Sequence, residues 1–240
     1  MKYAINNWVY DDEPIRETFM RLSRYGYDGI ELKGEPSLYD IEEIKSLCKE
    51  FDLQVTSVLG WTIRGIPGRD LSSPDESERS AAVKFLKEVV DFAVQLGAPV
   101  LLVLPFPAGR TTPTGDPQLE DEWISTAATE WRNAVDSVRQ LSGYASGQNI
   151  TLAVEPINRF ETYQLTTAEQ ARKFIREVNA DNVKLNLDTY HMNMEESDPA
   201  AAILNSGEYL VHMHAADSNR QAPGSGHTDF VDLFKALKSV

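Results

Sequence analysis

The chain has 240 residues, of which 42% are hydrophobic and 25% are charged, an ordinary composition for a globular domain. Acidic residues outnumber basic residues by 37 to 23, which gives a formal net charge of -14. A surface this acidic repels phosphate backbones and anionic lipids, so the composition argues against nucleic-acid and membrane partners. The single cysteine, Cys48, cannot form an internal disulfide, and the N-terminus carries no signal-peptide pattern. We therefore predict a cytoplasmic protein.

Short apolar runs of the β type alternate with longer segments of helical period along the chain. In chain order, the predicted strands are 3–7, 29–32, 54–59, 100–104, 151–155, 183–188 and 209–214, and the predicted helices are 13–25, 39–51, 76–96, 119–145, 167–178, 198–205 and 228–239. Because the strands are short and apolar, we expect protein to cover both faces of the sheet, as in parallel sheets joined by helices.

Seven successive β-then-α units are typical of a (β/α)8 barrel or of a doubly wound open sheet. The chain lacks the glycine-rich motifs of dinucleotide-binding sheets and P-loops, so the barrel is favoured. Eight strands close such a barrel. We therefore predict an α/β protein with the TIM barrel fold, a single domain over residues 1–240, whose eighth β/α unit is missing from this sequence. The irregular stretch 105–117 follows a predicted strand, where a barrel places active-site loops.

Potential metal ligands end the last three predicted strands: Glu155, Asp188 and His214. The C-terminal ends of barrel strands meet at one pocket, so we expect these side chains to converge. Taken singly, a strand-end acid often caps the next helix and a lone histidine often belongs to the core. Three such residues at equivalent positions favour a shared function. Two carboxylates and one imidazole suit Mn²⁺, Mg²⁺ or Co²⁺ better than structural zinc.

Three further polar residues lie a few positions beyond those strand ends: Glu161, His191 and Arg220. A sugar needs several fixed hydrogen bonds to its hydroxyl groups, and these side chains supply donors and acceptors. The alternative is ordinary loop polarity, in which each side chain contacts only solvent. These residues are candidates for substrate binding.

The segments that contain these residues resemble the ketose 3-epimerases, which include the tagatose and psicose 3-epimerases of the xylose isomerase-like superfamily. The similar segments are 154–162, 187–196 and 211–220, and the run DTYHMN at 188–193 is the most specific of them. The resemblance is dense from about 150 to 230 and rests, before that, on the alternation of strands and helices.

This resemblance implies a role for each candidate residue. Glu155, Asp188 and His214 would bind a divalent metal, usually manganese, while Glu161, His191 and Arg220 would hold substrate oxygens. Glu155 would also be one of two acid–base carboxylates. The second carboxylate would belong to a Glu that ends an eighth strand, which this sequence does not contain.

The implied reaction is the inversion of C3 in a 2-ketose, through an enediolate, by proton transfer to and from carboxylates. No glycine-rich phosphate cradle is evident, so a free sugar is favoured over a phosphorylated one. A homodimer or a homotetramer is compatible with this kind of barrel.

Three alternatives stay open. An aldose–ketose isomerase of the same superfamily, such as hydroxypyruvate isomerase, would use the same metal but move the proton between adjacent carbons. A zinc-dependent AP endonuclease would draw histidines from early strands, whereas the four histidines lie at 191, 212, 214 and 227. A non-catalytic sugar-binding protein would keep the pocket without the acid–base pair.

Overall fold

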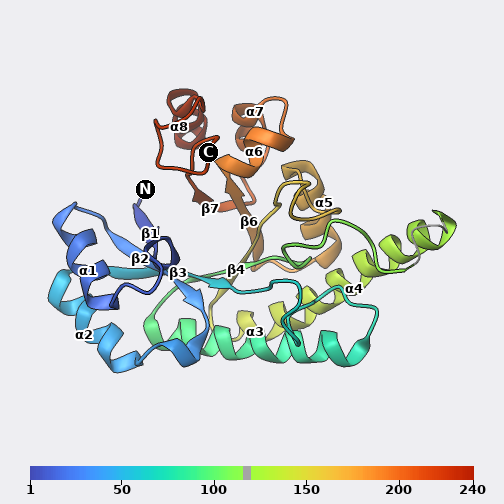
Figure 1. Cartoon of the computed structure of the whole chain (residues 1–240), viewed down its shortest axis with the longest axis horizontal. Helices are drawn as coiled ribbons and strands as arrows, with labels where there is room; N and C mark the ends of the chain where they lie inside the picture. The colour runs from blue at the N-terminus through green and yellow to red at the C-terminus, as the bar shows by residue number, and fades with distance from the viewer. Residues whose placement is uncertain (116–119) are drawn as a thin grey trace.

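The computed structural model describes residues 1–115 and 120–240, and its sheet contains seven parallel strands paired in chain order. These are β1 (Ala4–Asn6), β2 (Gly29–Gly34), β3 (Gln54–Gly60), β4 (Val100–Val103), β5 (Thr151–Val154), β6 (Val183–Asp188) and β7 (Leu210–His214). The sheet curls, so that β7 comes back towards β1 and β2 (Figure 1). The predicted strands and their parallel order are confirmed.

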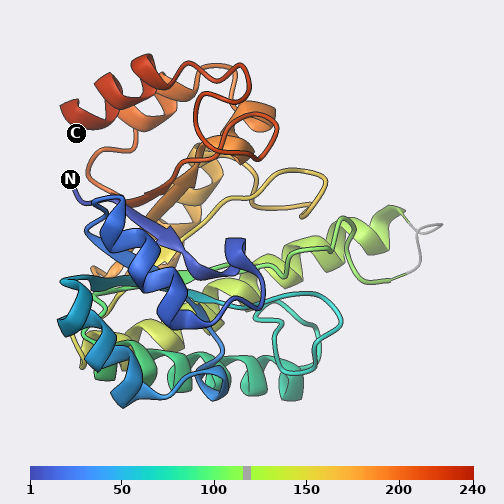
Figure 2. The ribbon, with the colours of Figure 1, turned by 60° about the vertical axis from the view of Figure 1, so that its left-hand side comes forward.

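The helices cover the outside of this curled sheet (Figures 1 and 2). They are α1 (Ile15–Arg24), α2 (Ile41–Phe51), α3 (Glu76–Leu96), α4 (Glu120–Ser146), α5 (Ala168–Val178), α6 (Thr189–Glu195), α7 (Pro199–Leu204) and α8 (Phe230–Ser239). The side chain of Asp75 accepts the Ser77 backbone N–H at the start of α3, and Thr167 forms a capping box with Gln170 at the start of α5. These caps satisfy N–H groups that have no partner within the helix.

Apolar side chains fill both sides of the central strands. Leu101 and Val103 of β4 belong to the large outer cluster, which also contains Val89 of α3. Leu102, between them in sequence, points the other way and packs in a small inner cluster with Ala153 of β5. This alternation is the period of a β-strand, and each fully buried aliphatic side chain contributes about 1.5–3 kcal/mol. The expectation that both faces of the sheet are covered is confirmed.

The sheet is open between β1 and β7. Each of these strands has a single neighbour in the sheet, and the described residues contain no eighth strand. This agrees with the predicted barrel that lacks one β/α unit. A cavity of about 1520 Å³ extends along this side and is lined by residues of β1, β2, β7 and α8.

Some local features differ from the sequence-based expectations. Asn7, predicted as the end of a strand, begins the 3-10 helix η1 (Asn7–Tyr10), and the helices α6 and η2 (Pro36–Leu38) were not predicted. The end of the predicted loop 105–117 and the first residue of the predicted helix 119–145 lie outside the described residues. None of the helices that the structure describes is long and apolar enough to cross a membrane.

Candidate metal and substrate site

The three predicted ligands lie at the same edge of the sheet. Glu155 directly follows β5, Asp188 is the last residue of β6, and His214 is the last residue of β7. Asp188 and His214 are direct partners in the register between β6 and β7. Because the strands are parallel, their C-terminal ends deliver all three side chains to the same end of the cavity.

The structure brings these three side chains into contact. The Nδ1 atom of His214 lies 3.2 Å from Oε1 of Glu155 and 3.9 Å from Oδ2 of Asp188. Both carboxylates are buried. Asp188 also caps α6, because its Oδ1 accepts the Tyr190 backbone N–H at 2.8 Å. The capping role and the ligand role are therefore compatible, since each uses a different oxygen.

The pKa values of Glu155, Asp188 and His214 are shifted because these side chains are buried close together. Burial alone would raise the pKa of Glu155, but the attraction and hydrogen bond of His214 hold that pKa below its usual value. Burial raises the pKa of Asp188, and the nearby His191 and His214 offset this only in part. Burial opposes the charged form of His214, yet the carboxylates of Glu31 and Glu155 raise its pKa well above 6.5.

The donor set fits a divalent cation. Three buried carboxylates, those of Glu31, Glu155 and Asp188, surround the single ring of His214, so negative charge is in excess. Buried charges of one sign are costly unless a partner neutralises them. Oxygen-rich ligands with one imidazole suit Mn²⁺ or Mg²⁺. Glu155, Asp188 and His191 also offer ligand atoms that all lie within 4.8 Å of one another, so His191 requires its own assignment.

The hydrogen bonds of His191 occupy its Nδ1 atom. Its Nδ1 accepts the backbone N–H of Asn158 at 3.2 Å and lies 2.7 Å from the side-chain nitrogen of Asn158. A ring nitrogen that accepts an N–H is unprotonated, so the proton of this imidazole is on Nε2. His191 lines the cavity, where an Nε2–H group can donate to a sugar oxygen. Asn158 is buried and was not singled out from the sequence.

Glu161 and Arg220 form an ion pair at the same end of the cavity. Nη1 of Arg220 lies 2.9 Å from Oε1 of Glu161, and the guanidinium stacks 4.6 Å from the ring centroid of Tyr190. Arg220 has a positive φ of 61°, which is uncommon for a residue other than glycine. The buried carboxylate of Asp217 accepts N–H groups from the surrounding loop, including that of Gly224 at 2.8 Å. This loop therefore holds Arg220 in place.

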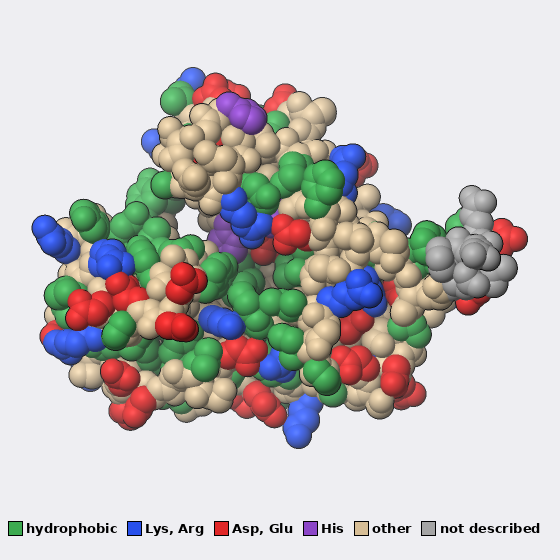
Figure 3. Space-filling model, in the orientation of Figure 1, with side chains coloured by type: hydrophobic (Ala, Val, Ile, Leu, Met, Phe, Trp, Pro, Cys, Tyr) green, Lys and Arg blue, Asp and Glu red, His purple; other side chains and the backbone are tan. Residues whose placement is uncertain are grey.

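The cavity also has an aromatic wall. The rings of Trp8 and Trp61 meet edge to face at 5.7 Å, and Nζ of Lys33 lies 4.2 Å from the Trp61 ring centroid. Figure 3 shows the hollow from outside, with apolar surface and a histidine side chain inside it. Such a wall can contact the C–H faces of a sugar, while polar side chains such as His191 and Arg220 can form hydrogen bonds with its hydroxyl groups.

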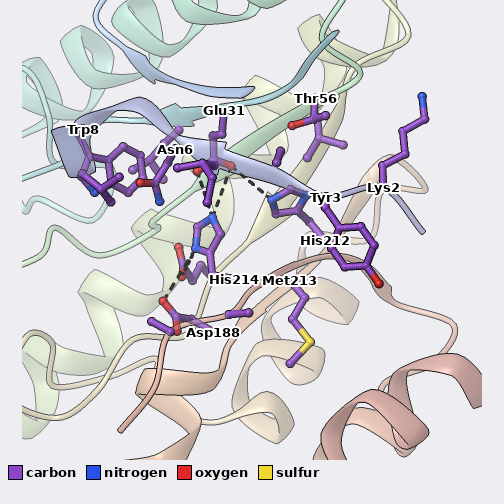
Figure 4. A pocket seen from close by; sticks show the side chains of 18 of the residues that line it. Lys2, Tyr3, Asn6, Trp8, Glu31, Thr56, Asp188, His212, Met213 and His214 are labelled. Atoms are coloured by element: carbon purple, nitrogen blue, oxygen red, sulfur yellow. Dashed lines mark hydrogen bonds and ion pairs between the residues drawn. The ribbon is translucent and has the colours of Figure 1, made fainter. Parts of the chain in front are cut away.

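One residue that the sequence analysis did not single out, Glu31, faces His212 and His214. Glu31 lies in the middle of β2, and its side chain points at His212 and His214 across the interior (Figure 4). The sequence did contain a signal for this residue: Glu31 stands between two apolar residues, Ile30 and Leu32, in a predicted strand, where a buried carboxylate is uncommon.

The curled parallel sheet, with carboxylates and an imidazole gathered at the ends of its strands, defines a TIM-barrel protein with a candidate metal centre. The family described as Xylose isomerase-like TIM barrel matches residues 19–240. The chain belongs to this family, as the sequence analysis predicted.

Its relatives include sugar epimerases. The 3-dehydro-D-guloside 4-epimerase of Escherichia coli K12 is 30% identical over 100% of this chain and 88% of its own length. The ketose 3-epimerase of Arthrobacter globiformis is 31% identical over 96% of this chain and 75% of its own length. The predicted enzyme class, a carbohydrate epimerase, agrees with these relatives.

Solved structures of sugar epimerases are similar in fold to this chain. The D-allulose 3-epimerase from Methylomonas sp., in complex with D-allulose, superposes with a TM-score of 0.84 at 28% identity, over 100% of this chain and 80% of that one. The D-psicose 3-epimerase of Clostridium cellulolyticum H10 with D-tagatose superposes with a TM-score of 0.84 at 25% identity, over 100% of this chain and 81% of that one.

Proposed function

We propose that this protein is a divalent-metal-dependent epimerase that inverts C3 of a free 2-ketose, with Mn²⁺ as the expected cation and Mg²⁺ or Co²⁺ as alternatives. The observation that carries the proposal is the convergence of Glu155, Asp188 and His214 at three successive strand ends inside one cavity. The similarity to ketose 3-epimerases over most of the chain supports the same reaction.

In this proposal Glu155, Asp188 and Nδ1 of His214 hold the cation. When bound, the cation acts as a Lewis acid that stabilises the negative charge developing on the substrate oxygens. The fit of the donor set, two buried carboxylates and one imidazole, supports this assignment.

Glu155 is the proposed base at C3. Because its pKa is lowered, it is ionised at neutral pH and can accept the C3 proton. The C–H bond breaks, an O–H bond forms on Glu155, and the electron pair passes into the adjacent carbonyl group as an enediolate. In this proposal the Nε2–H of His191 and the guanidinium of Arg220 hold sugar oxygens, and the ion pair between Glu161 and Arg220 supports this assignment.

Inversion also requires an acid that returns a proton to the opposite face of C3. The acidic residues that line the cavity, among those described, are Glu31, Glu155, Glu161 and Asp188. Glu31 is engaged by histidines, Glu161 by Arg220, and Asp188 belongs to the proposed cation site. Among the described residues, Glu155 is the one carboxylate to which the proposal gives an acid–base role, in addition to its role at the cation site.

A second candidate reaction is epimerisation at C4 of a 3-keto glycoside, which also removes a proton from a carbon beside a ketone. The E. coli relative named above favours this reaction.

Isotope exchange in deuterated water distinguishes these reactions. The Mn²⁺-loaded protein is incubated with D-fructose or D-psicose, and we expect deuterium at C3, the C3 epimer as product, and no aldose. Deuterium at C4 of a 3-keto glycoside, with none in the ketoses, would support the second candidate. An aldose labelled at C1 would identify an isomerase. Cleavage of abasic DNA without sugar turnover would contradict the proposal altogether.

A further inference from the structure

Glu31 is a buried carboxylate that bridges two distant parts of the sheet. Its Oε2 accepts a hydrogen bond from the Ser57 hydroxyl of β3 at 2.6 Å and lies 3.3 Å from Nε2 of His212. Its Oε1 lies 3.1 Å from Nε2 of His214. The two histidines belong to β7, which is not a neighbour of β2 in the sheet. Glu31 therefore contacts β7 across the interior of the curl, as Figure 4 shows.

This contact determines which nitrogen of His214 would keep its proton when a cation binds. Nε2 lies 3.1 Å from Oε1 of Glu31 and Nδ1 lies 3.2 Å from Oε1 of Glu155, so both nitrogens can donate to a carboxylate in the metal-free protein. A cation held by Glu155, Asp188 and His214 would replace the proton on Nδ1, while Glu31 would continue to accept the proton on Nε2. A histidine that binds a metal through one nitrogen needs this kind of support at the other nitrogen.

We propose that Glu31 is a positioning residue for the cation site, which fixes the ring orientation and the tautomer of His214; this inference rests on the proposed function. Glu31 is itself held in place, because its carboxylate accepts the hydrogen bond from Ser57 of β3. It therefore gives His214 a fixed acceptor from a part of the sheet that is not paired with β7.

A rival interpretation places the cation directly on Glu31. Glu31, His212 and His214 also offer ligand atoms within 4.8 Å of one another. This nitrogen-rich set would suit zinc better than Mn²⁺. The hydrogen bond from Ser57 and the short contacts to both imidazoles already give the Glu31 carboxylate three donors, which favours the positioning role.

Mn²⁺ binding by calorimetry separates the two interpretations. Glu31→Gln keeps an acceptor but loses the charge, and we expect about 10-fold weaker Mn²⁺ binding; Glu31→Ala should weaken it about 100-fold. His212→Gln should have a smaller effect than either Glu31 variant. Glu130→Gln is the matched control, because Glu130 is equally buried but contacts Thr114 and Tyr163 away from the site, and binding should not change. Thermal unfolding of each variant shows whether it folds.

A spectroscopic measurement reports the tautomer itself. In the Mg²⁺-loaded protein, nitrogen-15 NMR of the imidazole should show His214 protonated on Nε2 and not on Nδ1. Protonation on Nδ1 would overturn the inference. Equal loss of Mn²⁺ affinity in His212→Gln and Glu31→Gln, with none in Asp188→Asn, would also overturn it and place the cation on Glu31.

The outcomes also distinguish this inference from the proposed function. If Glu31→Gln binds Mn²⁺ as the wild type does, while Asp188→Asn does not bind it, the positioning role is wrong and the cation site stands. If the wild-type protein itself does not bind Mn²⁺, the proposed function fails, and the positioning role fails with it.

Discussion

The two halves of the sheet contribute different groups to the site. Strands β5 to β7 end in Glu155, Asp188 and His214, whose side chains reach the cavity where the backbone leaves the sheet. Strands β1 to β4 contribute mainly apolar surface, and their buried acid, Glu31, lies within a strand instead of at its end. In the proposed function, the strand-end residues hold the cation and one of them, Glu155, moves the proton, while the mid-strand residue Glu31 orients His214.

The largest effect should come from a strand-end residue. Glu155→Gln removes the proposed base and weakens the cation site together, so we expect the rate of C3 epimerisation to fall by about 10³-fold or more. The measurement is deuterium exchange at C3, with Glu130→Gln as the control that should exchange at the wild-type rate. Exchange within about tenfold of the wild type would contradict the role of Glu155 as base.

A residue farther from the reacting carbon should affect binding more than the chemical step. Arg220→Ala should raise KM by about tenfold or more and change kcat little, because a guanidinium that holds the sugar does so in both the ground state and the transition state. Arg159→Ala is the matched control, since the side chain of Arg159 is exposed and pairs with Glu195. A fall in kcat with KM unchanged would show instead that Arg220 acts in the transition state.

The ionisation of His214 and of its partner Glu31 should make the stability of the metal-free protein depend on pH. Burial raises the pKa of Glu31, but His214 and His212 outweigh this and lower it well below 4.5. Its contribution is therefore present above about pH 4.5 and is lost as the pH falls through the folded-state pKa. The pKa of His214 is raised well above 6.5, so its contribution is full below about pH 6.5 and is lost as the pH rises.

We therefore expect the free energy of unfolding, measured with urea in the presence of a chelator, to be greatest between about pH 4.5 and pH 6.5. The free energy of unfolding should fall on both sides of this pH range. Glu31→Gln should reduce the loss of stability at acidic pH, and the part that remains should come from other carboxyl groups whose pKa is lowered, such as Asp217. If the Glu31→Gln variant loses as much unfolding free energy at acidic pH as the wild type does, the contact between Glu31 and His214 does not persist in solution.

The smallest effect should come from a residue that supports the fold without touching the site. Thr167→Ala removes the capping box of α5 and should lower the free energy of unfolding by about 1 kcal/mol. Mn²⁺ affinity should not change, and calorimetry checks this directly. A loss of affinity would show that stability and cation binding are coupled more tightly than the division between the two halves implies.

Much of this architecture could be predicted from the sequence because the strands are apolar on both faces and the helices have clear caps. The convergence of Glu155, Asp188 and His214 followed from their equivalent positions at the ends of parallel strands. The helix α6 was missed because it is short and its sequence is largely polar. The contact of Glu31 with His214 was missed because it joins residues 183 positions apart, and no local pattern reports such a contact.

The most direct test of the cation site is anomalous diffraction from crystals soaked with Mn²⁺. We predict a peak at ligand-bond distance, about 2.0–2.5 Å, from Glu155, Asp188 and Nδ1 of His214. Glu31 should remain in hydrogen-bond contact with Nε2 of the same ring. A peak between Glu31, His212 and Nε2 of His214, or no peak at either group, would contradict the account.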